Sequence, residues 1–289
     1  MRSVTLPTST PGAVRAGCDT DAVPGEQLLD VRGGPLAVDD PGGPNPPLVW
    51  SHGLTSSRQH EDDTGLFPWS SLADVRVIRY DARGHGRSGG PPDERAYVWQ
   101  SLGLDLLDVM IVTGVDRAAI GGASMGCASA LFAAMSRPEA VDRLVLAIPP
   151  TVWESRAPSA ELNRDGAAVV ETQGLGTLVE FLRAQPPLGM LGDDAARARD
   201  LGADSVARMD ADLLPHILRG AAASDLPDPE RVAEITQPAL VLAWTGDRTH
   251  PISSAERLVD VLPDAELVVA DDRDAIREWP ARVAAFVTG

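Results

Sequence analysis

Short apolar runs alternate along the chain with longer segments in which apolar residues recur at helical spacing. Each run has the length of a β-strand and is closed by a nearby Gly, Asp or Pro, which is typical of buried strands. The predicted strands, in chain order, are 26–31, 36–38, 48–50, 75–80, 118–120, 144–148, 239–244 and 267–269. The predicted helices are 97–113, 125–135, 254–262 and 274–287. This alternation predicts an α/β fold, in which a mostly parallel sheet lies between two layers of helices.

The strand pattern stops in the middle of the chain. Between residues 151 and 236 only helical patterns continue, for example over 177–183 and 204–214. We therefore expect a helical cap at 151–236, inserted into one α/β core made of residues 25–150 and 237–289. Residues 1–24 are rich in Pro, Thr, Ser and Gly and are expected to form a flexible tail.

The charge balance is strongly acidic and excludes several classes of function. There are 25 basic and 42 acidic residues, the net charge is −17, and every basic residue is Arg. Without Lys the chain has neither the phosphate-binding residue of a P-loop nor a Schiff-base amine. An acidic chain also lacks the basic face that nucleic acid or an anionic membrane needs, so neither is expected as a partner.

Cysteine content and hydropathy indicate the cellular compartment in which the protein is expected. Cys18 and Cys127 are the only cysteines, too few for a disulfide framework or a zinc site, and no other metal site is indicated. We find no apolar run of the length of a signal peptide core or of a membrane span. The sequence therefore predicts a cytoplasmic protein.

The strongest chemical signal is the pentapeptide GASMG at residues 122–126, a G-x-S-x-G motif between a predicted strand and a predicted helix. A sharp strand-to-helix turn raises the Ser124 side chain above the sheet, and small neighbours allow the backbone to make that turn. The helix that follows directs free N–H groups and the positive end of its dipole at the same point. Ser124 is therefore the candidate nucleophile.

Two further motifs follow predicted strands: SHGL at residues 51–54 and DARGHGRSG at residues 81–89. The second contains G-x-G-x-x-G, but two prolines follow it where a dinucleotide site would need a helix, so we reject that interpretation. With GASMG, these motifs make the chain similar to the α/β-hydrolase superfamily over most of residues 26–289. The resemblance implies a parallel sheet with a helical cap, a serine nucleophile and no cofactor.

The resemblance also implies the other parts of the site. The His-Gly turn would place Gly53 beside the nucleophile and the Leu54 N–H in an oxyanion hole, together with the N–H of Met125. Asp247, on the loop after a late strand, matches the acid of a catalytic triad, and its place after Ser124 fits the chain order of this fold.

The chain departs from the family pattern at the general base of the catalytic triad. The family carries its triad His after the final strand, and alignment on Pro280 puts Arg273 there instead. Arg stays protonated and cannot act as a general base. One hypothesis is that His250, three residues after Asp247, is the base. His60 and His216 are the other imidazole candidates.

Two further hypotheses do not use an imidazole. A carboxylate of the cluster at residues 271–274 could take the proton, if burial raises its pKa. Alternatively, the triad is incomplete, in which case the oxyanion hole and substrate binding still support some catalysis.

The leading interpretation is a cofactor-free serine hydrolase that cleaves an ester or related acyl bond of a small, apolar molecule. Ser124, Asp247 and His250 would be its triad. One alternative is a catalytically reduced protein that binds a small ligand under the cap. Another is a lyase or cyclase that uses the same pocket without hydrolysis.

Overall fold

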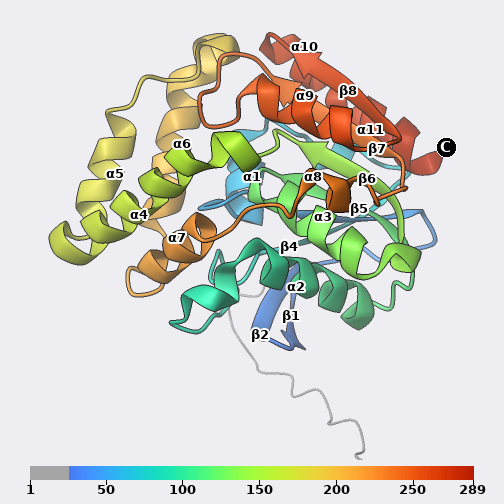
Figure 1. Cartoon of the computed structure of the whole chain (residues 1–289), viewed down its shortest axis with the longest axis horizontal. Helices are drawn as coiled ribbons and strands as arrows, with labels where there is room; N and C mark the ends of the chain where they lie inside the picture. Colours follow the sequence, from blue (N-terminus) through green and yellow to red (C-terminus); the bar gives the residue numbers. More distant parts are fainter. Residues whose placement is uncertain (1–25) are drawn as a thin grey trace, which may run out of the picture.

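The computed structural model describes residues 26–289, so the predicted tail at 1–24 lies outside the described residues (Figure 1). Its strands form one sheet of eight in the order β1-β2-β4-β3-β5-β6-β7-β8. β1 and β2 are an antiparallel hairpin at one edge, and the strands from β4 to β8 are parallel. Their bounds are β1 Glu26–Val31, β2 Gly34–Asp39, β3 Pro47–Ser51, β4 Arg76–Tyr80, β5 Ala118–Ala123, β6 Val141–Ala147, β7 Ala239–Trp244 and β8 Ala265–Ala270. The predicted α/β fold is confirmed.

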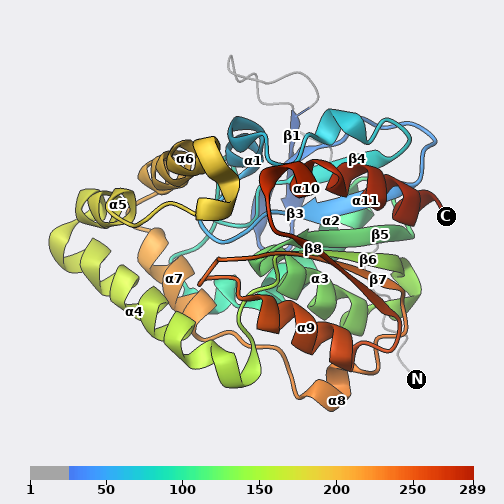
Figure 2. The ribbon, with the colours of Figure 1, turned by 90° about the horizontal axis from the view of Figure 1, so that it is seen from above.

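Helices cover both faces of this sheet (Figure 2). The helices of the core are α1 Arg58–Thr64, α2 Trp99–Val112, α3 Met125–Ser136, α9 Ile252–Val261, α10 Arg273–Arg277 and α11 Trp279–Thr288. Helices α2, α3 and α9 pack on one face, and α10 and α11 pack on the other. The strands alternate accordingly, since Val49 of β3 lies in the first cluster and its neighbours Leu48 and Trp50 lie in the second. A strand buried on both faces reads as a continuous apolar run, which is how these strands appear in the sequence.

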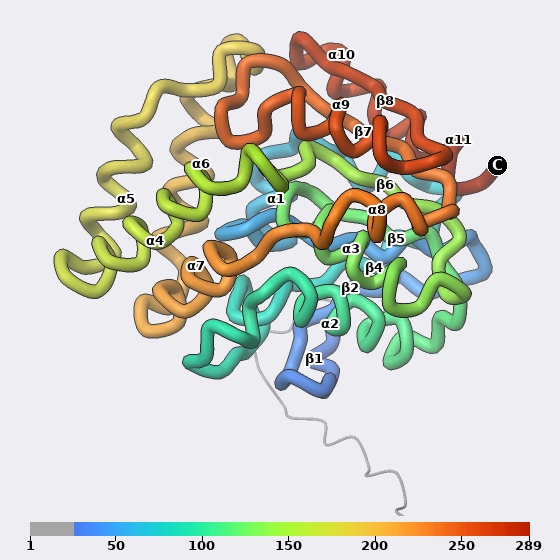
Figure 3. Tube along the Cα trace, in the orientation of Figure 1, coloured from blue at the N-terminus to red at the C-terminus, as the bar shows by residue number. Residues whose placement is uncertain are grey.

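The segment between β6 and β7 is helical. We call residues 151–236 the cap segment; its helices are α4 Arg156–Gln173, α5 Leu175–Arg183, α6 Ala195–Ala207, α7 Leu214–Ala222 and α8 Pro229–Val232. Helices α4 to α7 gather at one end of the molecule, beside the sheet (Figures 1 and 3). They share a buried cluster of their own, which includes Val170, Val179, Val206 and Ile217.

Two predicted helices are interrupted in the structure. The predicted helix at 204–214 covers the end of α6, a turn and the start of α7. At that turn the Asp210 carboxylate accepts from the backbone N–H groups of Asp212 at 2.8 Å and Leu213 at 3.3 Å. These two N–H groups are thereby satisfied outside a helix. The predicted helix at 274–287 is divided at Glu278, because Pro280 lacks the N–H that a continuous helix needs and instead lies in the first turn of α11.

Among residues 26–289, no helix combines the length and the apolar character needed to cross a bilayer.

Glycines on two helices provide a matched test of packing. A Cβ added at Gly103 of α2 would lie 2.8 Å from Ser129 O and from Phe132 Cβ of α3, whereas one added at Gly202 of α6 meets nothing within 4 Å. We expect Gly103→Ala to lower the free energy of unfolding by about 1–3 kcal/mol, because it forces α2 away from α3. We expect Gly202→Ala to raise it by about 0.5–1 kcal/mol. Urea denaturation measures both changes, and equal effects of the two variants would contradict the close packing of α2 on α3.

Candidate active site

Ser124 occupies a strained turn between β5 and α3. Its φ is 51°, in the left-handed region that a residue with a side chain rarely adopts. The flanking glycines make the turn possible: a Cβ at Gly122 or at Gly126 would lie 2.3 or 2.0 Å from the carbonyl oxygen of Ser51 on β3. The G-x-S-x-G spacing is therefore a steric requirement here, and it presents Ser124 at the N-terminus of α3.

A chain of hydrogen bonds leads away from the Ser124 hydroxyl. Ser124 Oγ lies 2.8 Å from His250 Nε2, and His250 Nδ1 lies 2.8 Å from Asp247 Oδ2. An ionised carboxylate only accepts, so Nδ1 carries the proton and Nε2 is left to accept from the hydroxyl. This neutral tautomer has the polarity that a general base needs.

Asp247 is held as a carboxylate by several donors. The backbone N–H of Thr249 donates to Oδ1 at 2.8 Å, and Trp244 Nε1 donates to Oδ2 at 3.0 Å. Burial alone would raise the pKa of Asp247. The hydrogen bond from His250, together with these N–H donors, outweighs burial and holds the pKa of Asp247 well below its ordinary value.

Trp244 is a residue of the candidate site that no sequence motif singled out. Besides its bond to Asp247, its ring stacks on Trp279 of α11, with 6.2 Å between centroids and an interplanar angle of 21°. Through this stack, the end of β7 contacts α11, the last helix of the chain. Its position at the last residue of β7, three before Asp247, was the available signal.

The loop after β3 approaches the nucleophile from the other side. A Cβ added at Gly53 would lie 3.5 Å from Ser124 Cβ, so the two backbones are neighbours. Within residues 26–289, the N–H groups of Leu54 and Met125 donate to no acceptor. Met125 is the first residue of α3, where backbone N–H groups have no partner inside the helix. Both groups are therefore available as donors next to Ser124.

Two buried imidazoles brace this loop against the turn after β4. His52 Nδ1 donates to Gly53 O at 2.7 Å, and its Nε2 accepts from Ala82 N–H at 2.9 Å. His85 Nε2 accepts from Thr55 N–H at 3.2 Å, and its Nδ1 donates to a carbonyl of its own turn at 2.9 Å. Burial lowers the pKa of both rings, that of His52 to about 3. Both are neutral and fully engaged, so neither is a candidate base.

The other two candidate imidazoles, His60 and His216, lie on other elements. His60 Nδ1 lies 2.8 Å from Ser56 Oγ, and burial, followed by the charge of Arg208, lowers the pKa of His60. His216 is half-buried on α7. In the described part of the chain, which includes all five histidines, His250 is the imidazole that contacts Ser124.

The acidic cluster at 271–274 caps a helix and makes ion pairs. Asp272 accepts from the N–H of Ala275 at 2.8 Å and so caps the N-terminus of α10, and Asp274 pairs with an Arg one turn later. Arg273, at the position where the family pattern places its His, pairs with Asp194 of the cap segment.

Backbone strain gathers at the same edge of the sheet. Apart from glycines, the described residues with positive φ are Thr55, Ser124, Ile148 and Trp153. The first three follow the carboxyl ends of β3, β5 and β6, and the fourth opens the cap segment. Strained backbone persists where surrounding structure over-determines it, and it clusters at functional sites. Ligands of open parallel sheets also bind at this edge.

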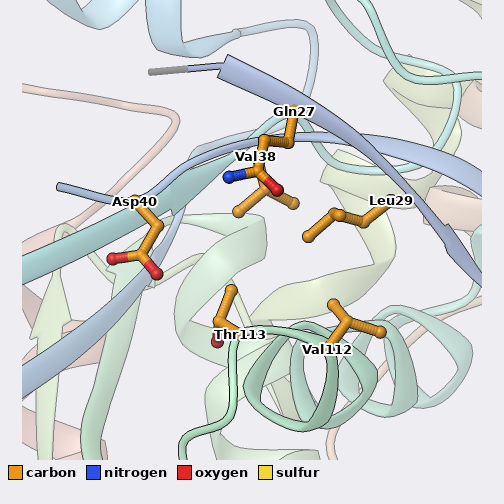
Figure 4. A pocket seen from close by; sticks show the side chains of 6 residues that line it. All are labelled: Gln27, Leu29, Val38, Asp40, Val112 and Thr113. Atoms are coloured by element: carbon orange, nitrogen blue, oxygen red, sulfur yellow. The ribbon is translucent and has the colours of Figure 1, made fainter. Parts of the chain in front are cut away.

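A pocket away from Ser124 has no comparable arrangement of a nucleophile, an imidazole and a carboxylate. It lies between the β1–β2 hairpin and the end of α2 and is lined by Gln27, Leu29, Val38, Asp40, Val112 and Thr113 (Figure 4). Its carboxylate, Asp40, already accepts from Arg76 Nε at 2.8 Å. Within residues 26–289, no three His, Cys, Asp or Glu side chains are grouped so that they could hold a metal ion.

These features have counterparts in known proteins. A model of the family described as alpha/beta hydrolase fold matches residues 46–275. The chain belongs to the alpha/beta hydrolase fold family. Its relatives include hydrolases that match most of its length, and the chain is itself a hydrolase of this family.

This hydrolase is 28% identical over 233 residues to RutD of Agrobacterium fabrum, named as a candidate carbamate hydrolase; the match covers 78% of this chain and 84% of that protein. It is 26% identical over 237 residues to 3-oxoadipate enol-lactonase 1 of Acinetobacter baylyi, covering 79% and 82% of the two chains. Its fold matches the crystal structure of a hydrolase from Pseudomonas aeruginosa with a TM-score of 0.77 at 24% identity, covering 93% of this chain and 100% of the other.

The two bracing imidazoles predict how the stability of this hydrolase depends on pH. In the unfolded chain they take up protons below about pH 6.5, whereas in the folded chain their pKa values are lower. The unfolded state then binds more protons, so the free energy of unfolding falls as pH falls from about 6.5, by about 1.4 kcal/mol per pH unit for each such ring.

His85→Gln tests this dependence. We expect the variant to be less stable than the wild type at pH 7, because the Thr55 N–H loses its partner. We also expect its stability to fall less steeply between pH 6.5 and 5, since one buried ring is gone. Urea denaturation at several pH values compares the slopes, and carboxylates contribute equally to both proteins. Identical slopes would contradict the assignment of a neutral, buried His85.

Proposed function

We propose that this hydrolase is a cofactor-free serine hydrolase that cleaves an ester or related acyl bond of a small, apolar molecule. Ser124 is the nucleophile, His250 the general base and Asp247 the acid that orients it. The observation that carries the proposal is the continuous path from Ser124 Oγ to His250 Nε2 and from His250 Nδ1 to Asp247, with 2.8 Å at both contacts.

In the first half-reaction, Ser124 Oγ forms a bond to the carbonyl carbon of the substrate while its proton passes to His250 Nε2. The carbonyl oxygen becomes an oxyanion, which the N–H groups of Leu54 and Met125 stabilise; one such donor is typically worth about 3 kcal/mol of barrier. The bond to the leaving group then breaks, and His250 gives the leaving group the proton.

In the second half-reaction, water attacks the acyl carbon of the ester on Ser124, and His250 takes a proton from that water. The acid product leaves when the bond to Ser124 Oγ breaks, and the proton returns to Ser124. Asp247 remains a carboxylate throughout and stabilises the His250 imidazolium that forms in each half. The depressed pKa of Asp247 is consistent with that role.

The names of the relatives support cleavage of a bond to a carbonyl carbon, and they cover more than one type of such bond. One relative is named for a carbamate and another for an enol-lactone. Both bonds have a carbonyl carbon that a serine can attack. The side chain of Leu54 packs against the sheet cluster and against the cluster of the cap segment, which favours an apolar group beside the carbonyl.

The proposed triad draws its acid and its base from one loop, residues 245–251 after β7. The loop after β8 then needs no base. Arg273 at that place pairs with Asp194 instead, and so connects the core to the cap segment. The departure from the family pattern is thus a relocation of the base that releases another loop for a structural contact.

A fluorophosphonate probe, read by intact mass, tests the proposed triad. We expect the wild type to gain one label and Ser124→Ala to gain none. We expect His250→Ala to react about a thousandfold more slowly or worse. Asp247→Asn should lose a similar factor, because an amide in place of the carboxylate can donate to Nδ1, and the proton then moves to Nε2.

His216→Ala is the matched control, since it removes a half-buried histidine of the cap segment and should label at the wild-type rate. Rapid labelling of His250→Ala would exclude His250 as the base. No labelling of the wild type would exclude an activated serine and favour the ligand-binding alternative.

A further inference from the structure

We infer that Ser205, on helix α6 of the cap segment, is a positioning residue for the oxyanion hole, so that docking of the cap segment completes the site. The inference rests on the proposed function, because it assigns the Leu54 N–H to the oxyanion. Ser205 Oγ donates to the carbonyl oxygen of Thr55 at 2.8 Å. Thr55 directly follows Leu54 on the loop after β3.

Each of three consecutive peptide groups in this loop, from Gly53 to Ser56, makes a hydrogen bond to a side chain. His52 Nδ1 holds Gly53 O, His85 Nε2 holds Thr55 N–H, and Ser205 Oγ holds Thr55 O. In a planar trans peptide the C=O and the N–H point in opposite directions. The bond to Gly53 O therefore sets the direction of the Leu54 N–H, and the next two bonds keep the following peptides from rotating it away.

The loop needs such restraint because its backbone is strained. Thr55 has a φ of 58° and a β-branched side chain, a combination that is rarely stable without external contacts. Its hydroxyl is occupied locally, since Thr55 Oγ1 donates to Leu54 O at 2.7 Å. Within the loop, Ser56 N–H donates to Gly53 O at 3.1 Å and closes the turn. His85 and Ser205 restrain Thr55 from outside the loop, and Ser205 is the group that the cap segment supplies.

Ser205 is a buried residue of α6, and its bond to Thr55 O is partly buried. The residue has 5% of its surface exposed. Helix α6 also reaches α1 through Arg197, which donates to Asp63 O at 3.0 Å, and through Arg208, 3.6 Å from the Asp63 carboxylate. Those contacts are exposed, so water and salt weaken them. A bond shielded from water keeps its strength and geometry.

The arrangement couples two parts of the chain that are 150 residues apart. While α6 lies against the loop, Thr55 is held and the Leu54 N–H points to the oxyanion position. When α6 moves away, Thr55 O loses its donor and the strained loop can relax. The hydrolase would then reach full activity only with the cap segment in place.

The rate of labelling by the fluorophosphonate probe tests this coupling, because the phosphoryl oxygen occupies the oxyanion position as Ser124 reacts. We expect Ser205→Ala to label about tenfold more slowly than the wild type, less than the loss of a whole oxyanion donor, and still to reach one label per chain. Ser205→Thr, which keeps the hydroxyl, should restore most of the rate. With a p-nitrophenyl ester, kcat should fall about tenfold in Ser205→Ala while KM stays unchanged.

Ser224→Ala is the matched control. Ser224 is another buried serine of the cap segment, 6% exposed. Its hydroxyl donates to Gly220 O at 2.7 Å and accepts from the Trp99 N–H at 3.1 Å, both away from the loop after β3. Ser224→Ala should lose at least as much stability as Ser205→Ala, because it leaves the Trp99 N–H without a partner, but only Ser205→Ala should lose labelling rate. If Ser205→Ala does not fold by circular dichroism, Ser205→Cys replaces it, since a thiol of similar size is a weaker donor.

The outcomes separate this inference from the proposed function. Full labelling at the wild-type rate in Ser205→Ala, or equal slowing in Ser224→Ala, would overturn the coupling and leave the triad intact. Absence of labelling in the wild type would overturn the triad and the coupling together.

Discussion

The backbone of β3 and the start of α3 lie closer together than any side chain would permit, and the candidate site depends on that contact. The carbonyl oxygen of Ser51 occupies the space that a Cβ on Gly122 or Gly126 would need. This approach brings the loop after β3 against the turn at Ser124. It therefore places the candidate oxyanion donors and the candidate nucleophile within one small volume.

The loops around that volume are rigid because buried polar groups satisfy one another. His52 and His85 are neutral rings, 5.2 Å apart between centroids, that cross-link the loop after β3 to the turn after β4. A buried network of this kind stabilises when every member has a partner and becomes costly when one is removed. These imidazoles thereby limit the stability of the protein in acid.

The loop after β7 concentrates the acid and the base of the proposed triad. Trp244 supports Asp247 from the strand, and Trp279 of α11 supports Trp244 by stacking. Because this loop holds both groups, the loop after β8 contacts the cap segment through Arg273 and Asp194. The contacts of the cap segment with the core thus include one beyond β8 and one at the loop after β3, where Ser205 donates to Thr55 O.

Much of the fold could be read from local patterns. Buried strands and amphipathic helices leave periodic signals, and all eight strands were predictable from them, whereas helices α1 and α4 were not predicted. Two predicted helices were wrong where one side chain interrupts a pattern, at the Asp210 turn and at Pro280. The position of Ser124 was also predictable, because its turn requires small residues at a fixed spacing.

What the sequence by itself determined is the α/β sheet, the Ser124 turn and an acid on the loop after β7. The tertiary structure decided that His250 rather than His60, His216 or a carboxylate meets Ser124 Oγ, and that Ser205 meets Thr55. Those contacts join residues 126 and 150 positions apart. Local periodicity carries no information about such pairs, since the path of a loop depends on the packing of distant elements against it.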